Sequence, residues 1–439
     1  MMAAVRVLIA PDSFDGTLTA AEAAEAIADG WRRHAPDDEL DLCPLSDGGP
    51  GFVNALHAGL GGRLIPVETP GPLGEPALAV ILLTDRPAES RKVSPKNDIS
   101  HQVGVFQIHR RVVQDQTDVV PNLRDVVPNP TEAVPTAYLE SAQACGLSLV
   151  PLPERDPGRS SSLGLGLLIA AALAAGARRV VIGLGGVATN DGGAGMLAGL
   201  AQGLDLPGAA DLVAALAGGG TSLRGVTAAQ VGVLAGLRER LADVELVAAS
   251  DLDVTLLGFK GTSSLYAAQK GATPEQAQEL DLAISDFARA ALETTGTPQR
   301  LVADPGSGAA GGLGFGLALL GARREPGARA VAAAVGLPDR LARAEVVITG
   351  EGTLDWQSLR GKVISAVAEL AQEVAVPTVA VAGQVLVGRR ELLTVGVESA
   401  YPVARTAAEI TRSLAEPAAR LADRAERVAR TWSPRSNPT

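Results

Sequence analysis

Two short segments of the sequence place an aspartate directly before a pair of glycines. They are Ser46-Asp47-Gly48-Gly49 and Asn190-Asp191-Gly192-Gly193, and each follows an apolar run typical of a strand. Glycine lets the backbone turn sharply and approach a ligand, while the carboxylate can accept a proton or bind a cation. One Asp-Gly-Gly segment usually forms a plain turn. Two of them, each following a strand, leave a plain turn and a functional site as open alternatives.

Three further predicted strands are followed by segments of similar composition, 11–19 (PDSFDGTLT), 250–253 (SDLD) and 351–362 (EGTLDWQSLRGK). Because ligands bind beyond the carboxyl ends of strands in an open parallel sheet, all five segments could line one rim. Acids there would suit proton abstraction from a hydroxyl, or Mg²⁺ binding beside phosphates. Glu351 and Asp355 could equally cap the helix that follows.

A glycine-rich segment, 305–316 (PGSGAAGGLGFG), precedes a helical pattern. Backbone N–H groups at such turns hold phosphates, and Lys270 and Lys362 could neutralise the phosphate charge. The alternatives are a plain turn before a close-packed helix and two solvated surface lysines. Residues 306–311 also match a dinucleotide fingerprint, but a poor strand precedes them and no second strand ending in an acid follows.

The segments that would position these residues alternate between strands and helices, which predicts an α/β fold with parallel sheets. Helices are predicted at 19–34, where Thr19 and Glu22 form a capping box, and at 273–295, where Thr273 is the cap. Residues 391–439 are expected to hold a final strand and a long helix. The remaining strands are predicted at 5–10, 39–45, 63–69, 77–84, 178–185, 244–250, 345–350 and 377–383.

Composition narrows the class of protein. At 439 residues the chain is long enough for two or three domains, and its net charge of −11, without a basic stripe, argues against nucleic acid as a partner. The longest apolar run ends at Ala177, too short for a membrane span. Cys43 and Cys145 are expected to be reduced and buried in a cytoplasmic protein.

One segment, 86–135, departs from the rest of the chain. It holds six prolines and a single glycine, whereas the whole chain holds 50 glycines. We interpret it as an exposed insertion.

Six ordered motifs together resemble the bacterial glycerate kinase family, in particular the type 1 glycerate 2-kinases. The resemblance runs from about residue 5 to 85 and resumes from about 136 to 390, whereas 86–135 matches nothing expected of the family. The motifs are 7–36 (VLIAPDSFDGTLTAAEAAEAIADGWRRHAP), 44–56 (PLSDGGPGFVNAL), 183–197 (GLGGVATNDGGAGML), 267–273 (AAQKGAT), 305–317 (PGSGAAGGLGFGL) and 348–363 (ITGEGTLDWQSLRGKV).

The resemblance implies phosphorylation of D-glycerate by ATP and Mg²⁺, usually at the 2-hydroxyl, giving 2-phosphoglycerate. It also implies two α/β domains, the second inserted into the first, with the active site in the cleft between them. The first would combine 1–70 with 291–390, followed by 391–439 as a C-terminal extension. The second would span 71–290. The implied partner is a small molecule, and a homo-oligomer is left open.

The resemblance also implies roles for individual residues. Asp191 is the favoured proton acceptor. Two alternatives stay open: phosphorylation at the 3-hydroxyl, and a catalytically impaired kinase-like binding or sensor protein, motivated by departures from the family pattern at 250–271 and by the insertion at 86–135. Asp15 is a further departure from the family pattern, beside the expected site. The expected residues are Asp191, Lys270, Asp47, Glu351 and Asp355 for catalysis, Asp47 and Asp355 for Mg²⁺, Ser13, Gly16, Ser46 and Asn190 for the substrate, and Gly306, Gly308, Gly311, Gly312 and Lys362 for ATP.

Overall fold

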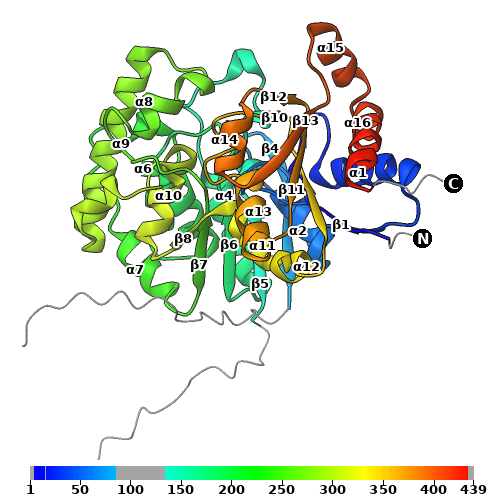
Figure 1. The fold of residues 1–439 in the computed structure, drawn as a ribbon. Coiled ribbons are helices and arrows are strands. Elements are labelled where there is room, and N and C mark those ends of the chain that lie inside the picture. Colours follow the sequence, from blue (N-terminus) through cyan, green and yellow to red (C-terminus); the bar gives the residue numbers. More distant parts are fainter. Residues whose placement is uncertain (1–3, 15, 86–133, 434–439) are drawn as a thin grey trace, which may run out of the picture.

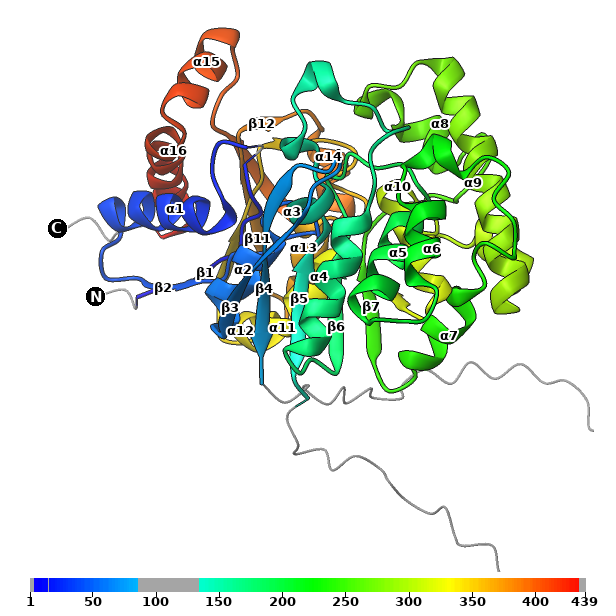
Figure 2. The same cartoon turned by 180° about the vertical axis from the view of Figure 1, so that it is seen from behind.

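The computed structural model describes residues 4–14, 16–85 and 134–433, which form two main β-sheets with helices on both faces of each (Figures 1 and 2). One sheet has five strands in the order β13-β11-β9-β1-β2, all parallel. These strands are β1 (Arg6–Ile9), β2 (Glu39–Leu42), β9 (Val346–Thr349), β11 (Thr378–Ala382) and β13 (Val397–Pro402).

The other main sheet has six strands in the order β3-β4-β5-β6-β7-β8. Strands β5 to β8 are parallel to one another, and β4 is antiparallel to both of its neighbours. The strands are β3 (Arg63–Pro70), β4 (Pro76–Thr84), β5 (Thr136–Glu140), β6 (Arg179–Gly183), β7 (Glu245–Ala249) and β8 (Arg323–Glu325), and a small separate pair is formed by β10 (Thr353–Leu354) and β12 (Gln384–Val385).

The predicted α/β class is confirmed, and each of the eight predicted strands is present. Strands β5 and β8 were not predicted. The final strand and helix expected in 391–439 are β13 and α16 (Pro417–Trp432). This segment belongs to the sheet, because β13 pairs with β11 and α16 packs against α1 (Ala20–His34).

The helices separate the structure into layers. Helices α1 and α16 cover the outer face of the five-stranded sheet, and a second set of helices lies between the two sheets (Figure 1). That middle layer contains α2 (Phe52–Leu60), α11 (Gly327–Ala334), α12 (Leu337–Leu341) and α13 (Val363–Glu373). The far face of the six-stranded sheet is covered by α4 (Leu163–Ala174), α5 (Ala194–Gly203), α9 (Pro274–Thr295) and α10 (Ala309–Leu319).

The middle layer joins both sheets in one hydrophobic cluster. Leu8 and Val347 of the five-stranded sheet belong to the same buried cluster as Val181 and Val247 of the six-stranded sheet. The remaining helices are α3 (Ser141–Cys145), α6 (Ala209–Leu216), α7 (Val233–Arg240), α8 (Thr262–Tyr266), α14 (Arg389–Thr394) and α15 (Ala407–Ala415).

The predicted capping box of α1 is present, and Thr273 caps α9 as predicted. The Thr19 side chain accepts from the Glu22 backbone N–H while the Glu22 carboxylate accepts from the Thr19 N–H. Thr273 makes the same reciprocal pair with Gln276 at the start of α9. These bonds satisfy N–H groups that have no partner within the helix, so the helix starts are fixed locally.

In chain order, all strands of the six-stranded sheet lie between β2 and β9. The chain changes sheet between β2 and β3 and again between β8 and β9. Strands β3 and β8 are thus the two edge strands of the six-stranded sheet, although 1–70 and 291–390, which contain them, were expected to form the other domain. The domain boundaries themselves stay a prediction.

Most of the unusual segment 86–135 lies outside the described residues, as does Asp15. The segment is bracketed by Thr84 and Thr136, which pair directly across β4 and β5. That pair lies at the opposite end of the sheet from the carboxyl ends of β5, β6 and β7.

Both cysteines are buried and free, as expected. Burial raises the pKa of the Cys43 thiol to about 12 and also raises the pKa of Cys145. Within the described ranges, none of the helices has the length and apolar content needed to cross a membrane.

Candidate active site

Four carboxylates and one lysine gather at the carboxyl ends of strands from both sheets. Asp12 follows β1, Asp47 follows β2 and Glu351 follows β9, while Asp251 follows β7 of the other sheet. Lys362 lies at the start of α13. We call these five residues the acid group.

Electrostatic interactions connect the members of this group. Burial, followed by the charges of Asp47 and Glu351, raises the pKa of Asp12 well above its ordinary value, and Lys362 partly opposes the effect. Burial disfavours the charged form of Lys362, but Asp47, Glu351, Asp12 and Asp355 outweigh burial and raise its pKa. The lysine therefore stays protonated in the middle of excess negative charge.

The turn at 46–49 brings the two sheets together at this point. Gly49 N–H donates to Asp47 Oδ1 over 3.0 Å, and Gly48 N–H donates to Ser46 Oγ over 3.2 Å. Gly48 has φ of +99°, and a Cβ there would lie 2.8 Å from the carbonyl oxygen of Ala249, the last residue of β7. Glycine is thus required for the turn and for close contact with the six-stranded sheet.

Asp251 is held in the same region by α11. Its Oδ2 accepts from Ala328 N–H over 3.2 Å, whereas its Oδ1 is buried and makes no hydrogen bond. Burial raises the pKa of Asp251 to about 7, opposed by hydrogen bonds from α11 and reinforced by Asp47. Asp12 and Asp251 were not predicted as site residues, although both lie in segments that follow predicted strands.

Because the N-cap of α13 is Lys362, with no side chain capping it, the structure does not give the helix-capping role to Asp355. Its Oδ1 accepts from Gln357 N–H over 2.7 Å and from Ser358 N–H over 3.3 Å, which stabilises the turn before α13. Its charge also acts on Lys362. Glu351 is largely buried, 8% exposed.

The second aspartate of the Asp-Gly-Gly pair has different surroundings. Asp191 is fully buried, and both of its oxygens accept hydrogen bonds. Oδ2 accepts from Ser162 N–H (2.9 Å), Ser162 Oγ (2.7 Å) and Gly195 N–H (3.2 Å), and Oδ1 accepts from Gly193 N–H (3.0 Å). Burial raises its pKa despite these bonds. Asp191 therefore ties the start of α4 to the start of α5.

Lys270 and Asn190 reinforce the same loop. The Lys270 ammonium is buried and donates to the Thr189 carbonyl oxygen over 2.6 Å. Burial lowers its pKa to about 8, although Cys145 and Asp191 act in the opposite direction. Asn190 donates to Ser263 Oγ over 2.8 Å. The expectation that Lys270 is a solvated surface charge is wrong.

The glycine-rich segment packs against this loop. Ala310, Gly311 and Gly312 all have positive φ, and a Cβ on Gly311 would lie 2.0 Å from the Thr189 carbonyl oxygen. Gly306 N–H and Gly308 N–H both donate to the Val254 carbonyl oxygen. These N–H groups are occupied inside the protein, so a phosphate would have to displace the Val254 carbonyl to use them.

A cavity of about 270 Å³ adjoins the same segment. It is lined by Gly306 and Ser307, by Ser250 at the end of β7, and by Arg324, which pairs with Asp253 over 2.7 Å. Ser250, which lines the cavity, directly precedes Asp251 in the chain. The charge of Arg324, another lining residue, acts to lower the pKa of Asp251.

The remaining predicted substrate residues lie around Asp12 and Asp47. Ser13 N–H donates to Asp12 Oδ1 over 2.7 Å, Gly16 is exposed with φ of +73°, and Ser46 is buried. The structure thus brings Asp47, Glu351, Asp355 and Lys362 together, and holds Asn190, Asp191 and Lys270 in a separate, buried set.

A metal ion at this site would need donor atoms from a bound substrate in addition to those of the protein. In the described part of the chain, no three His, Cys, Asp or Glu side chains lie close enough to hold a metal ion. Mg²⁺ commonly binds through one or two carboxylates together with phosphates and water. The acid group supplies the hard oxygen donors that this requires.

Acids and a lysine gathered at the carboxyl ends of parallel strands, beside a cavity, are the arrangement of an α/β phosphotransferase. The model of the glycerate kinase family matches residues 7–92 and 105–433, and the chain belongs to this family. Only 93–104 within 86–135 is unmatched, so the expectation that the whole segment departs from the family is wrong.

Named relatives agree with this membership. The chain is 35% identical over 401 residues to a glycerate kinase of Bacillus subtilis (strain 168), covering 91% of this chain and 90% of the relative. It is 35% identical over 381 residues to a glycerate 2-kinase of Escherichia coli (strain K12), covering 86% and 85%. A crystal structure of a provisionally assigned glycerate kinase 2 from Salmonella typhimurium LT2 is similar with a TM-score of 0.71 and 32% identity, covering 98% of this chain and 99% of that chain.

Proposed function

We propose that the protein transfers the γ-phosphoryl group of ATP to the 2-hydroxyl of D-glycerate. The hydroxyl oxygen forms a bond to the γ-phosphorus, and the bond from that phosphorus to the bridging oxygen breaks. ADP leaves with the electron pair, and the hydroxyl proton passes to a carboxylate. The observation that carries the proposal is the acid group, in which strand ends from both sheets meet in a member of this family.

Asp12 is the carboxylate that we propose as proton acceptor. It is half-buried at the carboxyl end of β1, and its raised pKa increases the affinity of the ionised carboxylate for a proton. Asp191, which the sequence favoured, is fully buried with both oxygens occupied, and its role as base stays a prediction.

Mg²⁺ fits the donors of this site. The charges of Asp47 and Asp355 both raise the pKa of Lys362, and the buried Oδ1 of nearby Asp251 has no hydrogen-bond partner. When bound, the ion would offset negative charge on the phosphates. Lys362 would stabilise the transferred group, and the cavity beside Gly306 and Ser307 would hold the rest of the nucleotide.

The test is release of ADP from ATP in the presence of D-glycerate and Mg²⁺, with the product analysed by ³¹P NMR. A phosphate on the 2-oxygen couples to one proton and gives a doublet, whereas one on the 3-oxygen couples to two and gives a triplet. Turnover with a doublet supports the proposal. A triplet moves the reaction to the 3-hydroxyl, and glycerate binding without turnover favours the impaired sensor.

The base is tested by Asp12→Asn, which keeps an oxygen for the Ser13 N–H bond. Removing a general base lowers kcat by about a hundredfold or more. Asp37→Asn is the matched control, because Asp37 is an exposed acid of the same sheet region and lies outside the site. If Asp12→Asn turns over like the control, the proton goes elsewhere.

A further inference from the structure

Helices α15 and α16 follow one another with only Glu416 between them, at the edge of the molecule outside the five-stranded sheet (Figure 1). Leu421, Ala425 and Val428 of α16 are buried in the core cluster shared with α1. The opposite side of α16 is rich in arginine. The packing role of this helix therefore leaves its charged side available.

A pocket of about 180 Å³ lies between the two helices. Its charged lining consists of Arg412, Arg420, Arg424 and Arg427 together with Glu409 and Asp423. Four cations thus face two anions, in a chain whose overall charge is −11. The local charge is opposite in sign to that of the whole protein.

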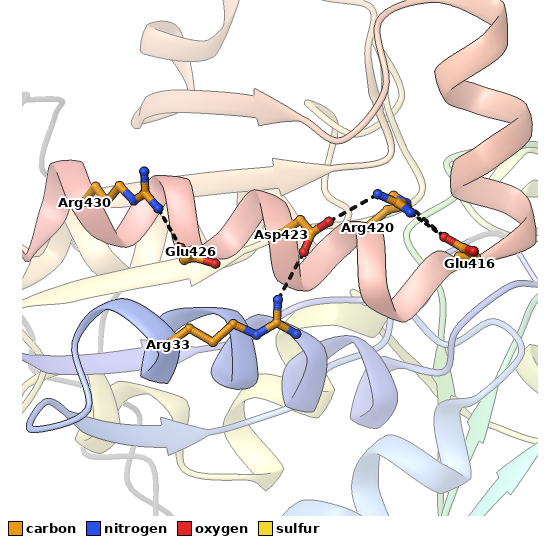
Figure 3. Close-up of polar contacts among 6 residues, drawn as sticks. All are labelled: Arg33, Glu416, Arg420, Asp423, Glu426 and Arg430. Carbon is orange, nitrogen blue, oxygen red and sulfur yellow. Dashed lines mark hydrogen bonds and ion pairs between the residues drawn. The ribbon is translucent and has the colours of Figure 1, made fainter.

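Both acids of the pocket are already engaged. Glu409 closes the capping box of α15, where its carboxylate accepts from Arg405 N–H (2.8 Å) and Thr406 N–H (3.1 Å). Asp423 pairs with Arg33 of α1 (3.1 Å) and with Arg420 (3.3 Å), and Figure 3 shows this chain of contacts. Arg420 also pairs with Glu416.

The other arginines of the pocket are not neutralised in this way. Between described residues, Arg424 and Arg427 make no hydrogen bond or ion pair, and Arg412 donates only to the Ala408 carbonyl oxygen. Arg424 is half-buried. Burial, followed by the charges of Arg427 and Arg405, lowers its pKa, and the charge of Glu409 partly opposes this effect.

We propose that this pocket binds a small oxyanion bearing a phosphate group, either inorganic phosphate or a phosphate monoester. Guanidinium groups present paired N–H donors that match phosphate oxygens, and an anion would relieve the repulsion among Arg405, Arg424 and Arg427. The site is separate from the acid group and does not depend on the proposed reaction.

A second pocket lies between this one and the loops that follow Asp12 and Glu351. Val403 and Ser413 line both pockets, and the second has a volume of about 80 Å³. Phe14, Leu18 and Gly352 line the far side of that second pocket, next to Asp12 and Glu351 in the chain. Residues of α15 and α16 thus line both the arginine-rich pocket and the pocket beside the loops that follow Asp12 and Glu351.

The test is binding of sodium phosphate and of glycerol 2-phosphate, measured by hydrogen exchange of peptides spanning 403–427, with sodium chloride at matched ionic strength as reference. Exchange in α15 and α16 is expected to slow with either phosphate and not with chloride. The compound that acts at the lower concentration identifies the source of the phosphate group.

Variants locate the response. Arg424→Gln with Arg427→Gln is expected to weaken the phosphate response about tenfold or more, because two charge-assisted donors are lost. Arg430→Gln is the matched control on α16, since Arg430 pairs with Glu426 away from the pocket (Figure 3). Arg424→Gln alone serves if the double variant does not fold.

Several results would overturn the proposal. These are an equal response to chloride, a full response in the double variant, loss of the response in Arg430→Gln, and protection only by anionic lipid vesicles. The first would mean a solvated helix face, and the last a membrane surface in place of a small oxyanion.

Discussion

The substitution Asp191→Asn distinguishes a structural role of this residue from a catalytic one. In Asp191→Asn the amide oxygen can occupy the Oδ2 position, where it still accepts from Ser162 and Gly195. The amide nitrogen then faces Gly193 N–H, which loses its acceptor in a fully buried site. The substitution also removes the negative charge from the three remaining hydrogen bonds.

The expected cost follows from these contacts. One buried N–H without an acceptor costs about 1–3 kcal/mol, and charge-assisted hydrogen bonds are roughly twice as strong as neutral ones. Removing the buried charge offsets part of this loss of stability, because burial disfavours the charged form of Asp191. We expect a net loss of about 2 kcal/mol in the free energy of unfolding.

Three measurements on the same sample test this reasoning. Urea unfolding followed by circular dichroism is expected to shift to lower urea, and hydrogen exchange is expected to quicken at Gly193. The folded variant is expected to retain kcat within about tenfold, whereas loss of a general base would cost about a hundredfold or more. Asp281→Asn is the matched control, because Asp281 accepts from Gly258 N–H at an exposed position.

The opposite pattern would refute the structural assignment. If Asp191→Asn unfolds at the wild-type urea concentration and keeps its hydrogen-exchange protection, yet loses turnover by a hundredfold, Asp191 is the proton acceptor that the sequence favoured.

Three further expectations concern the surroundings of the site. Burial lowers the pKa of Lys270 to about 8, so between that pH and about 10.4 the unfolded chain holds more protons, and stability rises with pH by up to about 3 kcal/mol. Lys270→Gln, which keeps a donor, is expected to lack this rise in urea titrations; an identical rise in both proteins would contradict it. A Cβ on Gly327 would lie 1.9 Å from the Asp47 carbonyl oxygen, so Gly327→Ala should displace Asp47 and reduce kcat about tenfold or more. The control is Gly236→Ala, where an added Cβ meets nothing within 4 Å, so activity should be kept and stability should rise by up to about 1 kcal/mol. Equal kinetics in the two variants would argue against displacement of Asp47 by Gly327→Ala. Replacing 86–133 by a short glycine-containing turn is expected to preserve the circular dichroism spectrum and turnover, because the strands that it joins are antiparallel neighbours; loss of folding would show that the segment contributes to the core.

The sequence predicted the strands whose apolar pattern is continuous and missed those defined by pairing. Strand β8 consists of Arg323, Arg324 and Glu325, and it is a strand because it pairs with the buried β7. No local hydrophobic pattern marks such an edge strand. The capping box of α1 and the Thr273 cap of α9, by contrast, depend on neighbouring residues in the chain and were predicted correctly.

The two Asp-Gly-Gly segments show where sequence reasoning about the site ends. Asp47 and Asp191 have the same local pattern, yet Asp47 joins the acid group and Asp191 is enclosed by Ser162 and by N–H groups of its own loop. Which outcome applies depends on a serine 29 residues away. Asp251 was not predicted as a site residue for a related reason. Its position beside Asp47 depends on the contact between Gly48 and Ala249, which the local sequence does not reveal.

The hydrophobic cluster of the middle layer limits how this protein can move. Since Leu8 and Val347 share one water-free interior with Val181 and Val247, wide separation of the sheets would expose that interior at a large free-energy cost. Entry of substrates through the loops at the rim would leave this cluster intact, whereas a hinge motion between the sheets would have to open it.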